Sequence, residues 1–295
     1  MDRIIYFMPG NEAIAYAISH KLVIPIGEMT LHTFPDGETY VRLLSDVREK
    51  EVIFIDSLHQ PDTKFLPLYF LCKLLKDEGA MKITLVAPYL AYMRQDKQFH
   101  SGEAVTSSYF AALLASFADE LITIDPHLHR RSSMNEIYPI PCKVLHATSV
   151  ISSWINTNIE KPLLVGPDSE SEQWVTKTAE KMNTPFIVLN KTRLSDTEVR
   201  ISVPDVYDYK DFTPVLIDDI ISTAKTMIVT AGHLMESGLK PAVCIGVHGL
   251  FSGNAYNDLL NSGVGRVVTC NTIQHLSNQI DVSDLIISSL SEEHR

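Results

Sequence analysis

Short apolar runs rich in β-branched residues alternate with longer stretches of helical pattern along this chain of 295 residues. The early runs are RIIYFM, EVIFID, KITLVAP and ELITID, and the later ones are PLLVGPD, PFIVLN, TPVLIDD and AVCIGVHG. The stretches 63–79, 104–117, 171–182 and 226–238 are each long enough for a crossover helix. Continuous apolar strands joined by such helices are typical of parallel sheets. We therefore predict an α/β fold with mainly parallel sheets flanked by helices.

A proline-containing segment, YPIPCKVLHATS, separates two series of strands and helices. Proline interrupts regular elements, and a new strand–helix series begins soon after this segment. We therefore expect two domains, at residues 1–142 and 143–295. In such folds ligands bind beyond the carboxyl ends of the strands, so polar residues at those ends are the candidates for a site.

Composition and charge exclude several classes of protein. The chain is 45% hydrophobic and 21% charged, as in ordinary soluble globular proteins. Its formal net charge of -11 argues against a general nucleic-acid or membrane-surface binder. The 4 cysteines form no C-x-x-C pair, and no apolar run approaches the ~20 residues of a membrane helix. We expect a cytoplasmic protein that handles any anionic ligand locally.

The stretch VLIDDIISTAKTM places Asp218 and Asp219 at the end of an apolar strand. Adjacent carboxylates repel and Asp is disfavoured in strands, so this pair costs stability unless a ligand uses it. Ser222, Thr223 and Thr226 follow where a helix begins, a place that favours phosphate. Hydroxyl residues alone are commonly only helix caps. Acids and hydroxyls together favour a sugar phosphate.

Two polar motifs of the first half have both a structural and a ligand-binding interpretation. HTFPDGETYVRL is typical of a hairpin turn, although Phe34 and Glu38 could also stack on a base and accept from its amino group. YMRQDKQFH follows an apolar strand and carries Arg94 and Lys97. These cations either face solvent or bind a polyphosphate.

Three further motifs lie at strand ends. TIDPHLHR puts Asp125, His127 and His129 at alternate positions, which would point the same way if the strand continued. Such residues suit a divalent cation or are hydrogen-bonded structural histidines, and two histidines favour transition metals over magnesium. VGPDSESEQW adds acids after another strand, at Asp168 and Glu170.

The stretch VLNKTRLSDTEVRI carries Lys191 and Arg193 in what we expect to be a polar loop after a strand. Exposed cations are usually only solubilising. A mobile loop with this pair could instead close on transferring phosphates and neutralise charge in the transition state.

Taken in order, these motifs resemble the ribose-phosphate diphosphokinase family, the phosphoribosyl pyrophosphate synthetases. FPDGE, PYLAYMRQDK, TIDPHLH, GPDSE, NKTR, LIDDIISTAKT and VHGLFSG all have counterparts there, over most of the chain. The resemblance implies two tandem phosphoribosyltransferase-type domains. It also implies transfer of the β,γ-diphosphoryl group of Mg-ATP to the C1 hydroxyl of ribose 5-phosphate, leaving AMP. Because a loop from a neighbouring subunit completes the ATP site in this family, it implies a homo-oligomer with active sites near a subunit interface.

The resemblance also implies roles for individual residues. The positions that match ATP-binding ones are Phe34, Asp36, Glu38, Arg94, Gln95, Asp96 and Lys97. Magnesium is associated with His127 and Asp168, where one imidazole with ATP oxygens and waters is tolerable for Mg²⁺. Ribose 5-phosphate would be held by Asp218, Asp219, Ser222, Thr223, Ala224, Lys225 and Thr226. Lys191 and Arg193 match the catalytic pair.

The chain departs from the family where glycine pairs are common. Ala224 and Lys225 replace one pair, and Glu170 and Ser171 replace another. Because alanine adopts positive φ only at a cost, we expect αR or extended backbone at Ala224. The alternatives are a phosphoribosyltransferase and a catalytically silent regulatory partner. The ATP-like motifs argue against the first, and the retained catalytic groups against the second.

Overall fold

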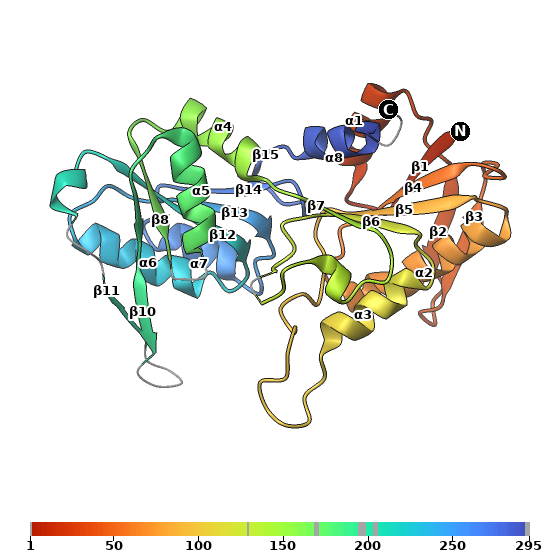
Figure 1. The fold of residues 1–295 in the computed structure, drawn as a ribbon, viewed down its shortest axis with the longest axis horizontal. Coiled ribbons are helices and arrows are strands. Elements are labelled where there is room, and N and C mark those ends of the chain that lie inside the picture. The colour runs from red at the N-terminus through yellow and green to blue at the C-terminus, as the bar shows by residue number, and fades with distance from the viewer. Residues whose placement is uncertain (1, 129, 168–170, 194–198, 203–205, 293–295) are drawn as a thin grey trace. The chain divides into compact units, whose positions relative to one another are not determined.

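The computed structural model describes residues 2–128, 130–167, 171–193, 199–202 and 206–292 (Figure 1). The described residues fall into two compact units. The first comprises residues 1–146 with 272–274 and 282–295, and the second comprises 147–271 with 275–281. The last helix of the chain therefore belongs to the first unit, although it follows the last strand of the second.

The described part of the first unit is built on a five-stranded sheet in which all pairs are parallel. In spatial order its strands are β1 (Arg3–Phe7), β4 (Glu51–Ile55), β5 (Lys82–Ala87), β6 (Glu120–Ile124) and β7 (Cys142–Leu145). Figure 1 shows helices on both faces of this sheet. One face carries α1 (Glu12–Leu22) and α8 (Ser283–Glu292), and the other carries α2 (Pro61–Asp77) and α3 (Thr106–Ala115). The strands are continuous apolar runs because both faces are covered.

Two smaller elements complete the described first unit. β2 (Met29–Thr33) and β3 (Thr39–Leu43) form an antiparallel hairpin, and η1 (Met134–Glu136) is a 3₁₀ turn between β6 and β7. One buried acid lies in this sheet, at the amino end of β6. The carboxylate of Glu120 is neutralised there by the ammonium groups of Lys82 at 2.6 Å and Lys143 at 3.2 Å.

The described part of the second unit has a six-stranded parallel sheet. Its spatial order is β15 (Asn278–Ile280), β14 (Arg266–Cys270), β13 (Val243–Gly249), β12 (Thr213–Ile221), β8 (Pro162–Gly166) and β9 (Phe186–Val188). The helices are α4 (Thr148–Asn158), α5 (Glu172–Met182), α6 (Lys225–Glu236) and α7 (Ala255–Asn261), with a 3₁₀ turn, η2 (Tyr207–Tyr209). A separate ribbon pairs β10 (Asn190–Arg193) with β11 (Val199–Ser202).

Strand order in the second unit reverses between two neighbouring strands. From β8 the chain passes through α5 to β9 at one edge, whereas from β12 it passes through α6 and α7 to β13 and β14 toward the other. Parallel sheets of this kind bind ligands beyond the carboxyl ends of the strands at the point of reversal. The region beyond the carboxyl ends of β8 and β12 is therefore the position in this unit where a ligand is expected.

The prediction of parallel sheets flanked by helices is confirmed. In the part of the chain that the structure covers, no helix is both long and apolar enough to cross a membrane.

Candidate active site

The acid pair lies inside β12 rather than after it. The strand was expected to end near Asp218, but it continues to Ile221, and β13 pairs with it as far as Ile221 opposite Gly249. Asp218 stands opposite Gly246, where an added Cβ would lie 2.7 Å from the side chain of Ile221. Because Gly246 has no side chain, Ile221 fits beside it and β12 continues to Ile221. Both acids remain half-buried near the carboxyl end of the strand.

The loop after β12 leads directly into the amino end of α6. Two contacts join Ser222 of this loop to Ser252. Their hydroxyl oxygens are 3.1 Å apart, and the Ser252 amide donates to the Ser222 carbonyl at 3.0 Å. Thr223 and Lys225 are exposed and Thr226 is half-buried. The first amides of a helix bind phosphate well, since they lack helical acceptors and lie at the positive end of the dipole.

Ala224 adopts the conformation that the sequence argued against. Its φ of 58° and ψ of 2° are left-handed, so the expectation of αR or extended backbone is wrong. Ala224 is the residue at which the chain turns from β12 into α6. The methyl group is also buried. Alanine here therefore carries backbone strain that glycine would not.

The neighbouring strand β8 ends at Gly166. The predicted magnesium ligand Asp168, together with Glu170, lies outside the described residues. Ser171 is buried at the start of α5, and a Cβ on Gly166 would come 2.7 Å from its hydroxyl oxygen. The end of β8 at Gly166 therefore lies close against the start of α5.

Lys191 and Arg193 lie in a strand, not in the polar loop that we expected. Their backbones belong to β10, with Lys191 opposite Ile201 and Arg193 opposite Val199 of β11. Their side chains lie outside the described part of the structure. The backbone that carries these two cations is therefore part of a two-stranded antiparallel ribbon.

The hairpin predicted from HTFPDGETYVRL is confirmed. The amide of Phe34 donates to the carbonyl of Glu38 at 2.7 Å, and the Glu38 amide donates to a carboxylate oxygen of Asp36 at 3.2 Å. Gly37 has a φ of 95°, which suits glycine in this tight turn. Phe34 is 43% exposed, and its ring makes T-shaped contacts with His32 and Tyr40. The hydrogen-bonded turn therefore holds the Phe34 ring and the acids Asp36 and Glu38 close together.

The RQDK segment follows β5 at the carboxyl edge of the first sheet. Arg94, Gln95 and Lys97 are exposed there, as an anion-binding segment requires. Asp96 differs, because only 3% of its side chain is exposed and its carboxylate accepts from Arg130 at 3.1 Å. Direct contact of Asp96 with ATP, which the family resemblance implied, would require this ion pair to open.

The residues after β6 turn away from the strand at once. β6 ends at Ile124, and Asp125 has a φ of 36°, so Asp125 and His127 do not alternate along an extended segment as proposed. His129 lies outside the described residues. A carboxylate oxygen of Asp125 instead lies 2.7 Å from the ring nitrogen Nδ1 of His146. His127 is half-buried at this edge. Within the described ranges, no three His, Cys, Asp or Glu residues cluster as a metal site.

A buried polar group at the end of β4 was not identified from the sequence. Asp56 is fully buried, and the ammonium of Lys64 on α2 is 3.8 Å from one of its oxygens. Burial raises the pKa of Asp56 to about 7, and burial also lowers the pKa values of Lys64 and His59. The carboxyl edge of this sheet therefore holds an acid that titrates near neutrality.

The described structure gathers the predicted residues into two groups. Arg94, Gln95, Lys97 and His127 follow the adjacent strands β5 and β6, whereas Asp218, Asp219 and the loop 222–226 lie on β12 and after it. Arg130 and His146 were missed by sequence reasoning. Their only sequence signal is a position shortly after a strand.

Both halves of the chain are similar to domains of known proteins. Residues 4–117 match the N-terminal domain of ribose phosphate pyrophosphokinase, and residues 133–284 match the phosphoribosyl transferase domain. The protein named ribose-phosphate pyrophosphokinase in Sulfurisphaera tokodaii is 34% identical over 91% of this chain and 92% of its own. Ribose-phosphate pyrophosphokinase 4 of Saccharomyces cerevisiae is 32% identical over 98% of this chain and 92% of its own.

The fold has a close counterpart among solved structures. Phosphoribosylpyrophosphate synthetase from Mycobacterium smegmatis superimposes with a TM-score of 0.87 and 23% identity, over 99% of each chain. The two units thus have the architecture of tandem phosphoribosyltransferase-type domains. With both domains matched and relatives above 30% identity along nearly the whole length, the chain belongs to the ribose-phosphate pyrophosphokinase family.

Proposed function

We propose that this protein is an enzyme that transfers the β,γ-diphosphoryl group of Mg-ATP to the C1 hydroxyl of ribose 5-phosphate. The products are 5-phosphoribosyl 1-diphosphate and AMP. The observation that carries the proposal is the carboxyl end of β12, where two half-buried acids precede the loop at the amino end of α6. Acids suit ribose hydroxyls and helix amides suit a phosphate, and both lie at the reversal of strand order.

The two groups of residues divide the substrates between them. Asp218 and Asp219 accept hydrogen bonds from ribose hydroxyls, and residues 222–226 surround the 5-phosphate. Arg94, Gln95 and Lys97 bind ATP, with Phe34, Asp36 and Glu38 of the hairpin. Phe34 is exposed enough to stack on a base. In keeping with the family resemblance, we assign the hairpin to the ATP site of a neighbouring subunit in a cytoplasmic homo-oligomer.

The reaction is a displacement at phosphorus. The C1 hydroxyl oxygen forms a bond to the β-phosphorus, the bond from that phosphorus to the oxygen bridging to the α-phosphorus breaks, and AMP leaves with the electron pair. The hydroxyl proton passes to solvent. Positioning and charge neutralisation supply most of the catalysis in such transfers. We assign the neutralisation of developing charge to Lys191 and Arg193 on β10.

Magnesium enters this proposal as part of the Mg-ATP substrate. His127 is half-buried at the end of β6, adjacent to the strand that leads into Arg94. One imidazole and the carboxylate of Asp168, with phosphate oxygens, form a donor set that Mg²⁺ accepts. When bound, the ion neutralises charge on the β- and γ-phosphates. His127 and Asp168 would hold it there.

The nucleotide product tests the proposal. Purified protein incubated with Mg-ATP and ribose 5-phosphate should give AMP and a 1-diphosphate sugar in equal amounts, as measured by ³¹P NMR and nucleotide chromatography. Formation of ADP would indicate a simple kinase. Consumption of added 5-phosphoribosyl 1-diphosphate with a nucleobase, without AMP formation from ATP, would indicate a phosphoribosyltransferase. Absence of any turnover would favour a silent regulatory partner.

A further inference from the structure

The ATP-binding segment 94–97 is held by residues on either side of it. Leading into it, Ala91 and Met93 are buried, and within it Asp96 is buried, whereas Arg94, Gln95 and Lys97 are exposed. The outward direction of the exposed side chains therefore depends on what anchors the inward-facing ones.

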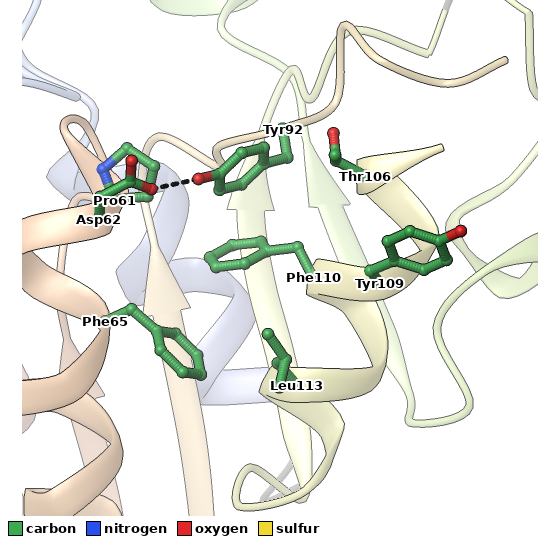
Figure 2. Close-up of a pocket in the computed structure, with 8 residues that line it drawn as sticks. All are labelled: Pro61, Asp62, Phe65, Tyr92, Thr106, Tyr109, Phe110 and Leu113. Atoms are coloured by element: carbon green, nitrogen blue, oxygen red, sulfur yellow. Dashed lines mark hydrogen bonds between the residues drawn. The ribbon is translucent and has the colours of Figure 1, made fainter. Parts of the chain in front are cut away.

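The first anchor lies just before the segment, at Tyr92. This residue has a φ of 62°, an unfavourable backbone conformation for a bulky side chain. Figure 2 shows its hydroxyl directed at Asp62 in the first turn of α2, to which it donates a hydrogen bond. Its ring packs on Phe110 of α3, with centroids 4.8 Å apart. Tyr92 thus bridges α2 and α3 at the point where the chain turns into the ATP segment.

A pocket of about 380 Å³ beneath Tyr92 makes this hydrogen bond more important. Phe65, Phe110 and Leu113 line it, together with Asp62 and Tyr92 (Figure 2). Because Tyr92 lines this pocket and is only half-buried, packing alone restrains its ring weakly. The hydroxyl contact with Asp62 therefore supplies the directional restraint.

The second anchor grips the segment at Asp96. One guanidinium nitrogen of Arg130 is 3.1 Å and 3.4 Å from the two carboxylate oxygens. A nitrogen of Arg131 donates to the Asp96 carbonyl at 2.9 Å. Arg130 follows β6, three residues after His127, so this contact ties the segment to the loop of the proposed magnesium ligand.

We propose that Asp62 and Arg130 are positioning residues for ATP, acting through Tyr92 and Asp96 respectively. Neither needs to touch the nucleotide. Together they fix the backbone of the segment so that Arg94, Gln95 and Lys97 project toward the triphosphate before it arrives. This inference rests on the proposed function, because it assumes that the segment binds ATP.

The test separates position from charge and from folding. Tyr92→Phe removes one hydroxyl without changing charge, and Arg130→Lys keeps the charge but loses the planar guanidinium. Asp62→Asn and Arg130→Gln break the same contacts but also remove a charge. Asp77→Asn at the other end of α2 and Arg48→Gln on the surface are matched controls, since both residues are exposed. Each protein is assayed for steady-state constants, for direct binding of a fluorescent ATP analogue and for its unfolding midpoint.

We expect the KM for ATP and the Kd of the analogue to rise roughly tenfold in all four test variants, about 1.4 kcal/mol of binding. The kcat should stay within about threefold and the KM for ribose 5-phosphate unchanged. The controls should match the wild type. The inference is overturned if only the charge-changing variants weaken binding, if both substrates are affected equally, or if ATP binding is unchanged.

Failure of the proposed function gives a different result. In that case the wild-type protein makes no AMP, but the titrations still compare how tightly the wild type and the variants bind the ATP analogue. Weaker binding of the ATP analogue in Tyr92→Phe and Arg130→Lys would support the positioning role even then. Wild-type protein that does not bind the analogue would overturn the inference along with the function.

Discussion

Replacing Asp56 with Asn should change how the stability of the protein depends on pH. Asp56 follows β4 and is fully buried. Its nearest cation, Lys64, approaches one of its oxygens only to 3.8 Å. Loss of hydration disfavours the carboxylate and raises its pKa from 3.8 to about 7, although Lys64 and Asn11 oppose the shift.

The magnitude follows from the difference between folded and unfolded pKa values. Because the folded state of Asp56 binds its proton more tightly, the unfolded chain carries fewer protons between pH 3.8 and about pH 7. The free energy of unfolding therefore falls as pH rises through this window and levels off above it. With one pKa unit equal to about 1.4 kcal/mol, the loss from pH 5 to pH 7.5 is about 2.5 kcal/mol.

Urea denaturation of wild type and Asp56→Asn at half-unit intervals from pH 5 to pH 8 measures this effect. The stability of the variant minus that of the wild type should grow by about 2.5 kcal/mol across this range. The lowered pKa of His59 acts in the opposite direction below pH 6.5, but His59 is present in both proteins and largely cancels. The exposed Asp77→Asn serves as the control. Parallel curves for wild type and Asp56→Asn would refute the reasoning, since they would mean that Asp56 is ionised throughout.

The proposed site yields further predictions. Ala224→Gly should raise the free energy of unfolding by about 0.5–1 kcal/mol in urea titrations by relieving the left-handed strain, and a loss of stability would contradict this. Asp219→Asn should raise the KM for ribose 5-phosphate at least tenfold while leaving ATP binding intact, because a charged hydrogen bond contributes about 1.5–3 kcal/mol; a selective loss of ATP binding would assign it to the other substrate. His127→Ala should raise the magnesium concentration needed for half-maximal rate, and an unchanged magnesium titration would leave His127 with a structural role. Lys191→Ala and Arg193→Ala should each lower kcat roughly a hundredfold with smaller changes in KM, and the double variant should lose less than the product; normal kcat with weakened binding would make the pair a docking surface.

Much of the fold could be predicted because parallel strands covered on both faces leave continuous apolar runs in the sequence. The turn residues Asp36 and Gly37 likewise mark the hairpin, since few other residues suit its backbone. The ends of the strands also located the candidate residues, because parallel strands deliver their carboxyl ends to one edge.

Contacts between distant residues were not predictable in the same way. Local pattern gave no sign that Gly246 would let β12 run past its acids, or that Asp96 would turn inward to Arg130, 34 residues later. The conformation of Ala224 was predicted from its own preference, but the connection between β12 and α6 overrides that preference. α8 belongs to the first unit because it packs against α1, and no motif in the sequence of α8 predicts that contact.

The charge distribution explains why phosphate recognition depends on these local details. At a net charge of -11 the protein as a whole repels polyanions, and salt screens that field over about 10 Å. Binding must therefore come from groups placed within a few ångströms of the phosphates. Arg94 and Lys97 after β5, and the amides at the start of α6, are such groups, and the amides act regardless of net charge. A small displacement of either segment would leave the general repulsion uncompensated, so the anchors of these segments matter as much as the cations they carry.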